Sequence, residues 1–135
     1  MTIKILEKIS QNEACLELSD KPQVLKIKFI SEIKPSSLEG DKYYFYINYE
    51  MEDGRKFGVS YVFDKEDDYY TCQSRSKLFN LVKGFLDIDE TTSNGIGFTR
   101  DDLMKLLLNK KFLATAEFRE IYGNTFPYIC VVNVL

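Results

Sequence analysis

Lysines and tyrosines alternate with other side chains in three segments of the first half of the chain. Lysine ammonium groups contact phosphates and tyrosine rings stack on unpaired bases, a combination that sequence-tolerant binding of single-stranded nucleic acid requires. Taken singly, tyrosines are also ordinary strand residues, and strand lysines keep a sheet edge soluble. The candidate contact residues are Lys26, Lys28, Tyr44, Tyr46, Asn48, Arg55, Lys56 and Ser60.

A second, smaller basic group lies in the second half of the chain. We expect Lys110, Lys111 and Arg119 to extend the path of positive charge, although a lysine pair after a helix also complements the helix dipole. Three carboxylates, Glu50, Glu52 and Asp53, are expected to lie close to the first group and to repel phosphate. We therefore expect binding of nucleic acid to be modest and sensitive to salt.

The segment 42–63 must position most of these side chains, and it has the pattern of one long β-hairpin. Asp53-Gly54 separates two alternating apolar runs, a pair that favours a two-residue turn with positive φ at both positions. The alternation assigns one face to the core, namely Tyr43, Phe45, Ile47, Tyr49, Met51, Phe57, Val59, Tyr61 and Phe63.

A strand over residues 24–30 precedes this hairpin. Its alternation predicts Leu25, Ile27 and Phe29 on the core face and Lys26 and Lys28 on the other face. The candidate residues of three consecutive strands therefore share one solvent face. This joint occurrence is what favours a binding role over a purely structural one.

Polar loops and a helix follow the early strands. Residues 34–41 and 64–68 have the composition of loops, and Ser74 is expected to cap a helix whose apolar residues recur over 78–86. Residues 1–21 fit either a short helix or an added strand, and form an N-terminal extension whose structure the pattern leaves open.

A second helix and two final strands complete the chain. A connector over 91–97 leads to a helix that is capped at Thr99 and ends near Asn109. The final strands are joined at 122–125, where Gly and Asn supply the positive φ of a tight turn. These strands are expected over residues 111–121 and 126–134.

The expected order is three strands, two helices and two strands in one domain that covers residues 1–135. This order is typical of a mainly β protein with the OB-fold, a five-stranded Greek-key barrel with helical sequence between its third and fourth strands. SH3-like barrels and other small β-rolls share the early meander, but rarely carry so long a helical segment at that point.

Composition argues against several classes of protein. The chain has no His, which removes the commonest general base and transition-metal ligand and argues against an enzyme. Its three Cys lack the spacing of a zinc site, and the acidic segment 64–68 lacks that of a calcium loop, so we expect no metal and no cofactor. No apolar run is long enough for a membrane helix, and we expect a cytoplasmic protein with a net charge of −3.

Four short segments carry a resemblance to a known group, namely Lys77–Phe85, Asp101–Leu103, Lys110–Phe112 and Tyr122–Ile129. On these motifs the chain resembles bacteriophage and prophage replication-module proteins that are related to single-stranded DNA-binding OB-fold proteins, and the similarity covers about residues 24–135. The resemblance implies an OB-fold, binding of single-stranded DNA, and a role in DNA replication or recombination.

Two functions remain open at this point. The first is a non-enzymatic, phage-derived or mobile-element protein that binds single-stranded DNA through its lysines and tyrosines. The second is a protein-interaction module or inhibitor that uses the same tyrosine-rich face to bind a host or replication protein, since tyrosine is also favoured at protein interfaces. A homodimer formed through the apolar last strand is compatible with either.

Overall fold

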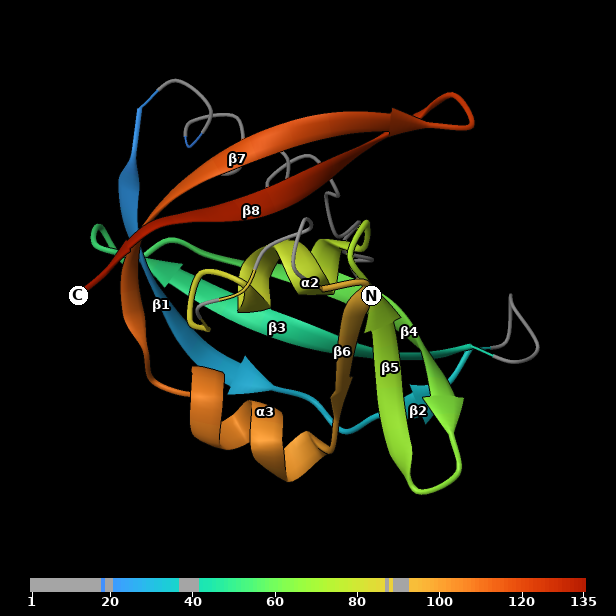
Figure 1. The fold of residues 1–135 in the computed structure, drawn as a ribbon. Coiled ribbons are helices and arrows are strands. Elements are labelled where there is room, and N and C mark those ends of the chain that lie inside the picture. Colours follow the sequence, from blue (N-terminus) through green and yellow to red (C-terminus); the bar gives the residue numbers. More distant parts are fainter. Residues whose placement is uncertain (1–17, 19–20, 37–41, 87, 89–92) are drawn as a thin grey trace, which may run out of the picture.

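One curled antiparallel sheet dominates the fold (Figure 1). The computed structural model describes residues 18, 21–36, 42–86, 88 and 93–135. The chain is mainly β, as the sequence predicted, and the sheet curls into a half-barrel. Its strands follow one another as β6 (Gly95–Phe98), β5 (Tyr69–Gln73), β4 (Lys56–Glu66), β3 (Tyr43–Met51), β1 (Gln23–Ile30), β7 (Lys111–Ile121) and β8 (Asn124–Val134), and the short β2 (Lys34–Pro35) pairs with β3.

Alternation in β3 and β4 separates core from solvent as the sequence predicted. Tyr43 is partly buried, and the other members of the predicted core face are no more than 5% exposed. The hydroxyl groups of Tyr49 and Tyr61 lie 2.5 Å apart inside this core. Their mutual hydrogen bond satisfies two polar groups that burial has removed from water.

Strand β1 departs from the predicted alternation at Lys28. Its register with β3 shifts between Ile27 and Phe29, so Lys28 is the extra residue of a β-bulge. A shift of one residue moves the following side chains to the opposite face of a strand. Phe29 is therefore 52% exposed and Ile30 is fully buried, and the prediction that Phe29 lies in the core is wrong.

The β3–β4 hairpin turns through three residues, not the predicted two. The backbone N–H of Met51 donates to the carbonyl of Arg55 at 2.8 Å, and the N–H of Gly54 donates to the carbonyl of Met51 at 3.0 Å. This is a type I turn that ends in a glycine with φ of 91°. The extra residue removes the need for positive φ at Asp53, so that part of the prediction is wrong.

The β7–β8 hairpin has the two-residue turn instead. Ile121 pairs with Asn124, which makes Tyr122 and Gly123 the central residues, with φ of 50° and 79°. The strand register thus moves the positive φ angles one residue earlier than the predicted Gly and Asn. Positive φ is uncommon for an aromatic residue, and the Tyr122 side chain is fully exposed.

Strands occupy parts of three segments that the sequence predicted as loops, so the predicted order of elements is incomplete. Strand β2 forms in the first loop, β4 runs through Glu66 of the acidic segment and turns at Asp67 and Asp68 into β5, and β6 forms in the connector. Aromatic packing explains β5 and β6, because the rings of Phe63, Tyr70 and Phe98 lie 5.2–6.0 Å apart. In β6, any side chain at Gly95 would clash with the backbone of Cys72.

Helix α2 (Lys77–Val82) begins at Ser76, not at the predicted cap Ser74. The Ser76 hydroxyl oxygen accepts a hydrogen bond from the N–H of Phe79 at 3.1 Å. Ser74 is held elsewhere, since its backbone N–H donates to the carbonyl of Asn94 at 2.9 Å. That bond continues the pairing of β5 with β6 and delays the start of the helix.

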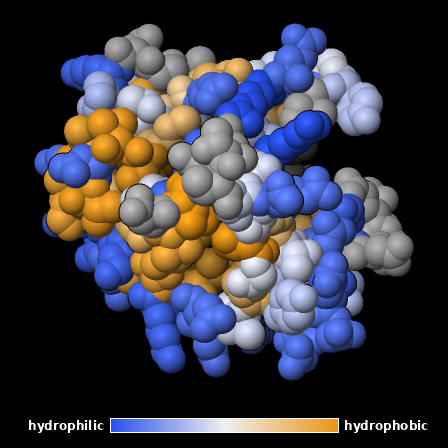
Figure 2. Space-filling view, viewed as in Figure 1, coloured by the Kyte–Doolittle hydropathy of each residue, from blue (hydrophilic) through white to orange (hydrophobic). Residues whose placement is uncertain are grey.

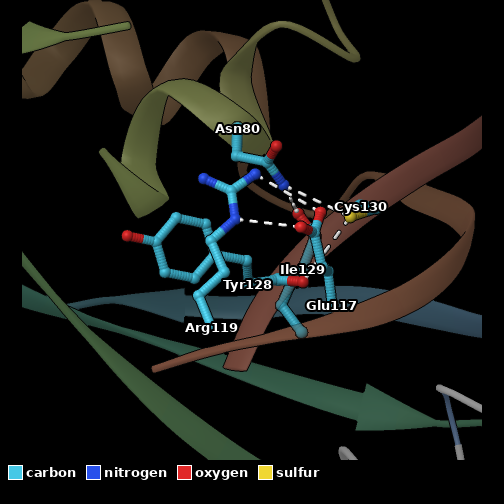
Figure 3. A network of polar contacts seen from close by, with 6 residues as sticks. All are labelled: Asn80, Glu117, Arg119, Tyr128, Ile129 and Cys130. Atoms are coloured by element: carbon cyan, nitrogen blue, oxygen red, sulfur yellow. Dashed lines mark hydrogen bonds and ion pairs between the residues drawn. The ribbon is translucent and has the colours of Figure 1, made fainter. Parts of the chain in front are cut away.

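Helix α2 lies inside the curl of the sheet and bonds to strands β4 and β8, which do not pair with each other (Figure 1). The Lys77 ammonium donates to the Ser60 carbonyl of β4 at 2.7 Å. The Asn80 amide donates to the Ile129 carbonyl of β8 at 2.8 Å (Figure 3). Two side chains of one short helix therefore connect the two strands across the open side of the half-barrel.

Helix α3 (Arg100–Leu107) begins with the predicted cap. The Thr99 hydroxyl oxygen accepts from the N–H of Asp102 at 3.2 Å, and the Asp102 carboxylate accepts from the N–H of Thr99 at 3.1 Å. The helix ends before Asn109, whose φ is 64°. Among the described residues, no helix combines the length and the apolar character needed to cross a membrane.

Parts of three sequence predictions concern residues that the structure does not describe. They are most of the N-terminal extension 1–21, the loop after Ser36, and the first part of the connector over 91–97. Within the extension, Leu18 is described and is fully buried in the core.

Candidate nucleic-acid interface

The solvent side of β1, β3 and β4, which we call the outer face, carries most of the candidate residues. Directly opposed residues of antiparallel strands share a face, so pairing arranges their side chains in rows. One row, the charged row, crosses four strands through Lys56, Glu50, Lys26 and Lys111. The Lys56 ammonium lies 3.7 Å from the Glu50 carboxylate. Three lysines and one glutamate leave this row positively charged.

An aromatic patch lies beside the charged row and consists of Phe29, Tyr44, Tyr46 and Val62. Three of its members are strongly exposed: Phe29 by 52%, Tyr46 by 47% and Val62 by 40%. Tyr44 is half-buried, and its ring packs edge-on against that of Tyr46 with centroids 5.6 Å apart. Exposed apolar side chains gathered on one strand face are typical of an interaction surface.

Small and polar side chains separate the row from the patch. Asn48 is exposed and pairs with Phe29 on one side and with Gly58 on the other. Ser60 pairs with Tyr46, and Lys28 is exposed at the bulge next to Phe29. The structure therefore gathers eight predicted residues on or beside one surface: Lys26, Lys28, Tyr44, Tyr46, Asn48, Lys56, Ser60 and Lys111.

Arg55 lies at the tip of the β3–β4 hairpin and is engaged by Asp53. Its guanidinium Nε lies 2.7 Å from one carboxylate oxygen of Asp53, and its backbone N–H donates to the other at 3.0 Å. The backbone hydrogen bond is the main reason why the pKa of Asp53 is lowered. The positive charge of Arg55 is thus offset locally.

Lys110 and Arg119 lie outside this surface. Lys110 is exposed in the turn between α3 and β7. Arg119 follows Lys111 by eight residues, which is about 26 Å along a strand. Its guanidinium bonds both carboxylate oxygens of Glu117, at 3.1 and 3.3 Å, and stacks 4.1 Å from the ring centre of Tyr128 (Figure 3). Hydrogen bonding to Glu117 raises the pKa of Arg119 further.

Phe29 and Val62 are the members of the aromatic patch that sequence reasoning missed. Strict alternation along the whole of β1 predicts Phe29 in the core. The adjacent apolar pair Phe29-Ile30 interrupts that alternation and is the signal that indicated a bulge. The alternation over 42–63 also implies a solvent-facing Val62, which is not among the candidate contact residues.

The end of β8 exposes a second apolar surface. Figure 2 shows apolar side chains gathered at the left of the view, where β8 ends, and Val132, Val134 and Leu135 are exposed there by 54%, 42% and 65%. Strand β8 also ends the order of paired strands in the sheet. Pairing with a second copy through this strand stays a prediction.

Comparison with protein-family models finds no match, and comparison with curated proteins finds no similar sequence. Within the described ranges, no three His, Cys, Asp or Glu side chains come together in a way that holds a metal ion.

Proposed function

We propose that the half-barrel is an OB-fold with an open seam. Strand β1 pairs with β3 and β7, β3 with β4, and β7 with β8. A closed OB barrel of this connectivity would add a pairing between β4 and β8. Here α2 bonds to both of those strands, and β5 and β6 extend the sheet beyond β4.

We propose further that the protein binds single-stranded DNA on the outer face without catalysing a reaction. The observation that carries this proposal is that the aromatic patch and the charged row lie on the same face of three neighbouring strands, with only small and polar side chains between them. The rings offer stacking platforms that only unpaired bases can reach, and the lysines contact the phosphates between them. A role in phage or mobile-element replication or recombination rests on the sequence resemblance.

The composition of the charged row sets the expected strength of binding. Glu50 lies between Lys56 and Lys26, so bound phosphate has to approach a carboxylate. If three lysines each neutralise one phosphate, log K falls with log salt with a slope of about −2. Binding is therefore expected to be modest and to weaken visibly between low and moderate salt.

Fluorescence anisotropy with a labelled oligo-dT tests this function. The double variant Tyr44→Ala, Tyr46→Ala is expected to lower affinity about 30-fold or more, since each stacked base contributes about 1–3 kcal/mol. Tyr69→Ala is the matched control: Tyr69 is 38% exposed, but its hydroxyl lies 3.2 Å from Glu66, in an acidic region. Absence of binding at micromolar protein would refute the proposal.

A protein partner is the second candidate, and the apolar content of the patch favours it. Phe29 and Val62 add exposed apolar surface that phosphate contacts do not require. Protein interfaces are enriched in aromatic side chains at their centre and have a polar rim. The aromatic patch corresponds to such a centre and the charged row to such a rim. Capture of one host protein from nuclease-treated lysate, lost with Phe29→Ala and accompanied by no oligonucleotide binding, would select this function.

A further inference from the structure

The outer face continues past the aromatic patch into a pocket at the junction of β4, β5 and α2. The pocket has a volume of about 230 Å³ and shares Val62 with the patch. If the register of β4 with β5 is continued by two residues, Gln73 lies opposite Val62. The other lining residues are Lys42, Phe63, Asp64, Cys72, Arg75 and Ser76.

Internal contacts already occupy part of this polar lining. Lys42 pairs with Asp64 at 2.6 Å. The Ser76 hydroxyl donates to the Gln73 carbonyl at 2.8 Å and accepts from the N–H of Phe79, which holds the turn that carries Gln73 and Arg75.

Gln73 and Arg75 carry the polar groups of the lining that these internal contacts do not occupy. Both residues are exposed, and within the described part of the chain neither side chain forms a hydrogen bond or ion pair. A side-chain amide offers a donor and an acceptor side by side, and a guanidinium offers a fork of donors that suits phosphate. Lys42 and Arg75 carry two positive charges and Asp64 one negative charge, so the lining of the pocket has a net positive charge.

We propose that this pocket binds one nucleotide unit, with its base beside Val62 and Gln73 and its phosphate on Arg75. The inference rests on the proposed function, because it makes the pocket the end of a DNA path that crosses the aromatic patch. A side-chain amide matches the N6 and N7 groups of adenine, so adenine is the preferred base. The volume of about 230 Å³ suits a single base.

Nuclear magnetic resonance of the full chain tests the pocket independently of oligonucleotide binding. Titration with dAMP is expected to shift the side-chain signals of Gln73 and Arg75 saturably, and dTMP is expected to shift them less. Equal shifts with inorganic phosphate alone would reduce the pocket to a general anion site and overturn the proposal. Equal shifts with dAMP and dTMP would overturn the role of Gln73 in reading the base.

Variants then connect the pocket to the outer face. Arg75→Ala is expected to weaken binding of an oligonucleotide with an adenine about tenfold or more, since it removes a charge-assisted hydrogen bond. Lys105→Ala, which removes one exposed positive charge from α3, is the control and is expected to change affinity less than twofold. Gln73→Ala is expected to abolish the difference between adenine and thymine.

The outcomes separate this inference from the proposed function. If oligonucleotides bind and depend on Tyr46 but not on Arg75 or Gln73, the pocket assignment is refuted and the proposed function stands. If dAMP shifts the Gln73 and Arg75 signals while no oligonucleotide binds, the pocket stands and the DNA path across the patch is refuted. Near-ultraviolet circular dichroism of each variant checks that the fold is retained.

Discussion

Replacing Phe29 with alanine is expected to weaken DNA binding strongly while reducing stability only slightly. The Phe29 side chain is 52% exposed, so the substitution forfeits about half of the 1.5–3 kcal/mol that full burial of such a side chain contributes, or about 1 kcal/mol. No enclosed cavity is created, because the site is open to solvent. Loss of one stacking platform is expected to raise Kd about 5-fold to 150-fold.

Phe45→Ala is the matched comparison. Phe45 belongs to the neighbouring strand β3, faces the core and is fully buried. Its substitution is expected to cost about 3–5 kcal/mol, because it adds a cavity to the lost burial. The same residue type is thus removed from opposite faces of one sheet, and only the buried position is expected to lower stability severely.

Urea unfolding and anisotropy on the same samples measure both effects. A Phe29→Ala variant that loses as much free energy of unfolding as Phe45→Ala would show that the ring belongs to the core, and the bulge at Lys28 would be refuted. A stable Phe29→Ala variant with unchanged affinity would instead remove Phe29 from the binding surface. Far-ultraviolet circular dichroism confirms that each variant remains folded before affinity is compared.

Three further predictions concern other parts of the molecule. Glu50→Gln is expected to tighten DNA binding about threefold to tenfold by removing the carboxylate of the charged row, whereas Glu120→Gln on β7 leaves anisotropy titrations unchanged. Asn80→Leu is expected to reduce the free energy of unfolding by about 1–3 kcal/mol, because the Ile129 carbonyl loses its donor, and so to lower the urea midpoint at constant m-value. An unchanged midpoint would contradict the bridging role of α2. Burial raises the pKa of the Cys72 thiol, so site-resolved iodoacetamide labelling at pH 8 is expected to modify Cys72 more slowly than the half-buried Cys130, and equal rates would contradict this.

The sequence by itself determined the features that depend on neighbouring residues. Alternation over 43–63 separated the core side chains from the outer face correctly, because side chains in a strand point to opposite sides at every step. The capping box at Thr99 was also readable, since its two hydrogen bonds join residues three positions apart. These same patterns identified Tyr44 and Tyr46 as solvent-facing members of a candidate site.

Only the tertiary structure decided the features that depend on strand pairing. The bulge that exposes Phe29 is set by the register of β1 against β3; the apolar pair Phe29-Ile30 marks a break in the alternation, but pairing decides which of the two faces the core. The charged row joins Lys26 to Lys111, residues far apart in the chain that pairing brings side by side. Whether a polar segment becomes a loop or a strand depends on a partner with which its backbone can bond; β5 supplies that partner to residues 64–66, whereas Asp67 and Asp68 form the turn.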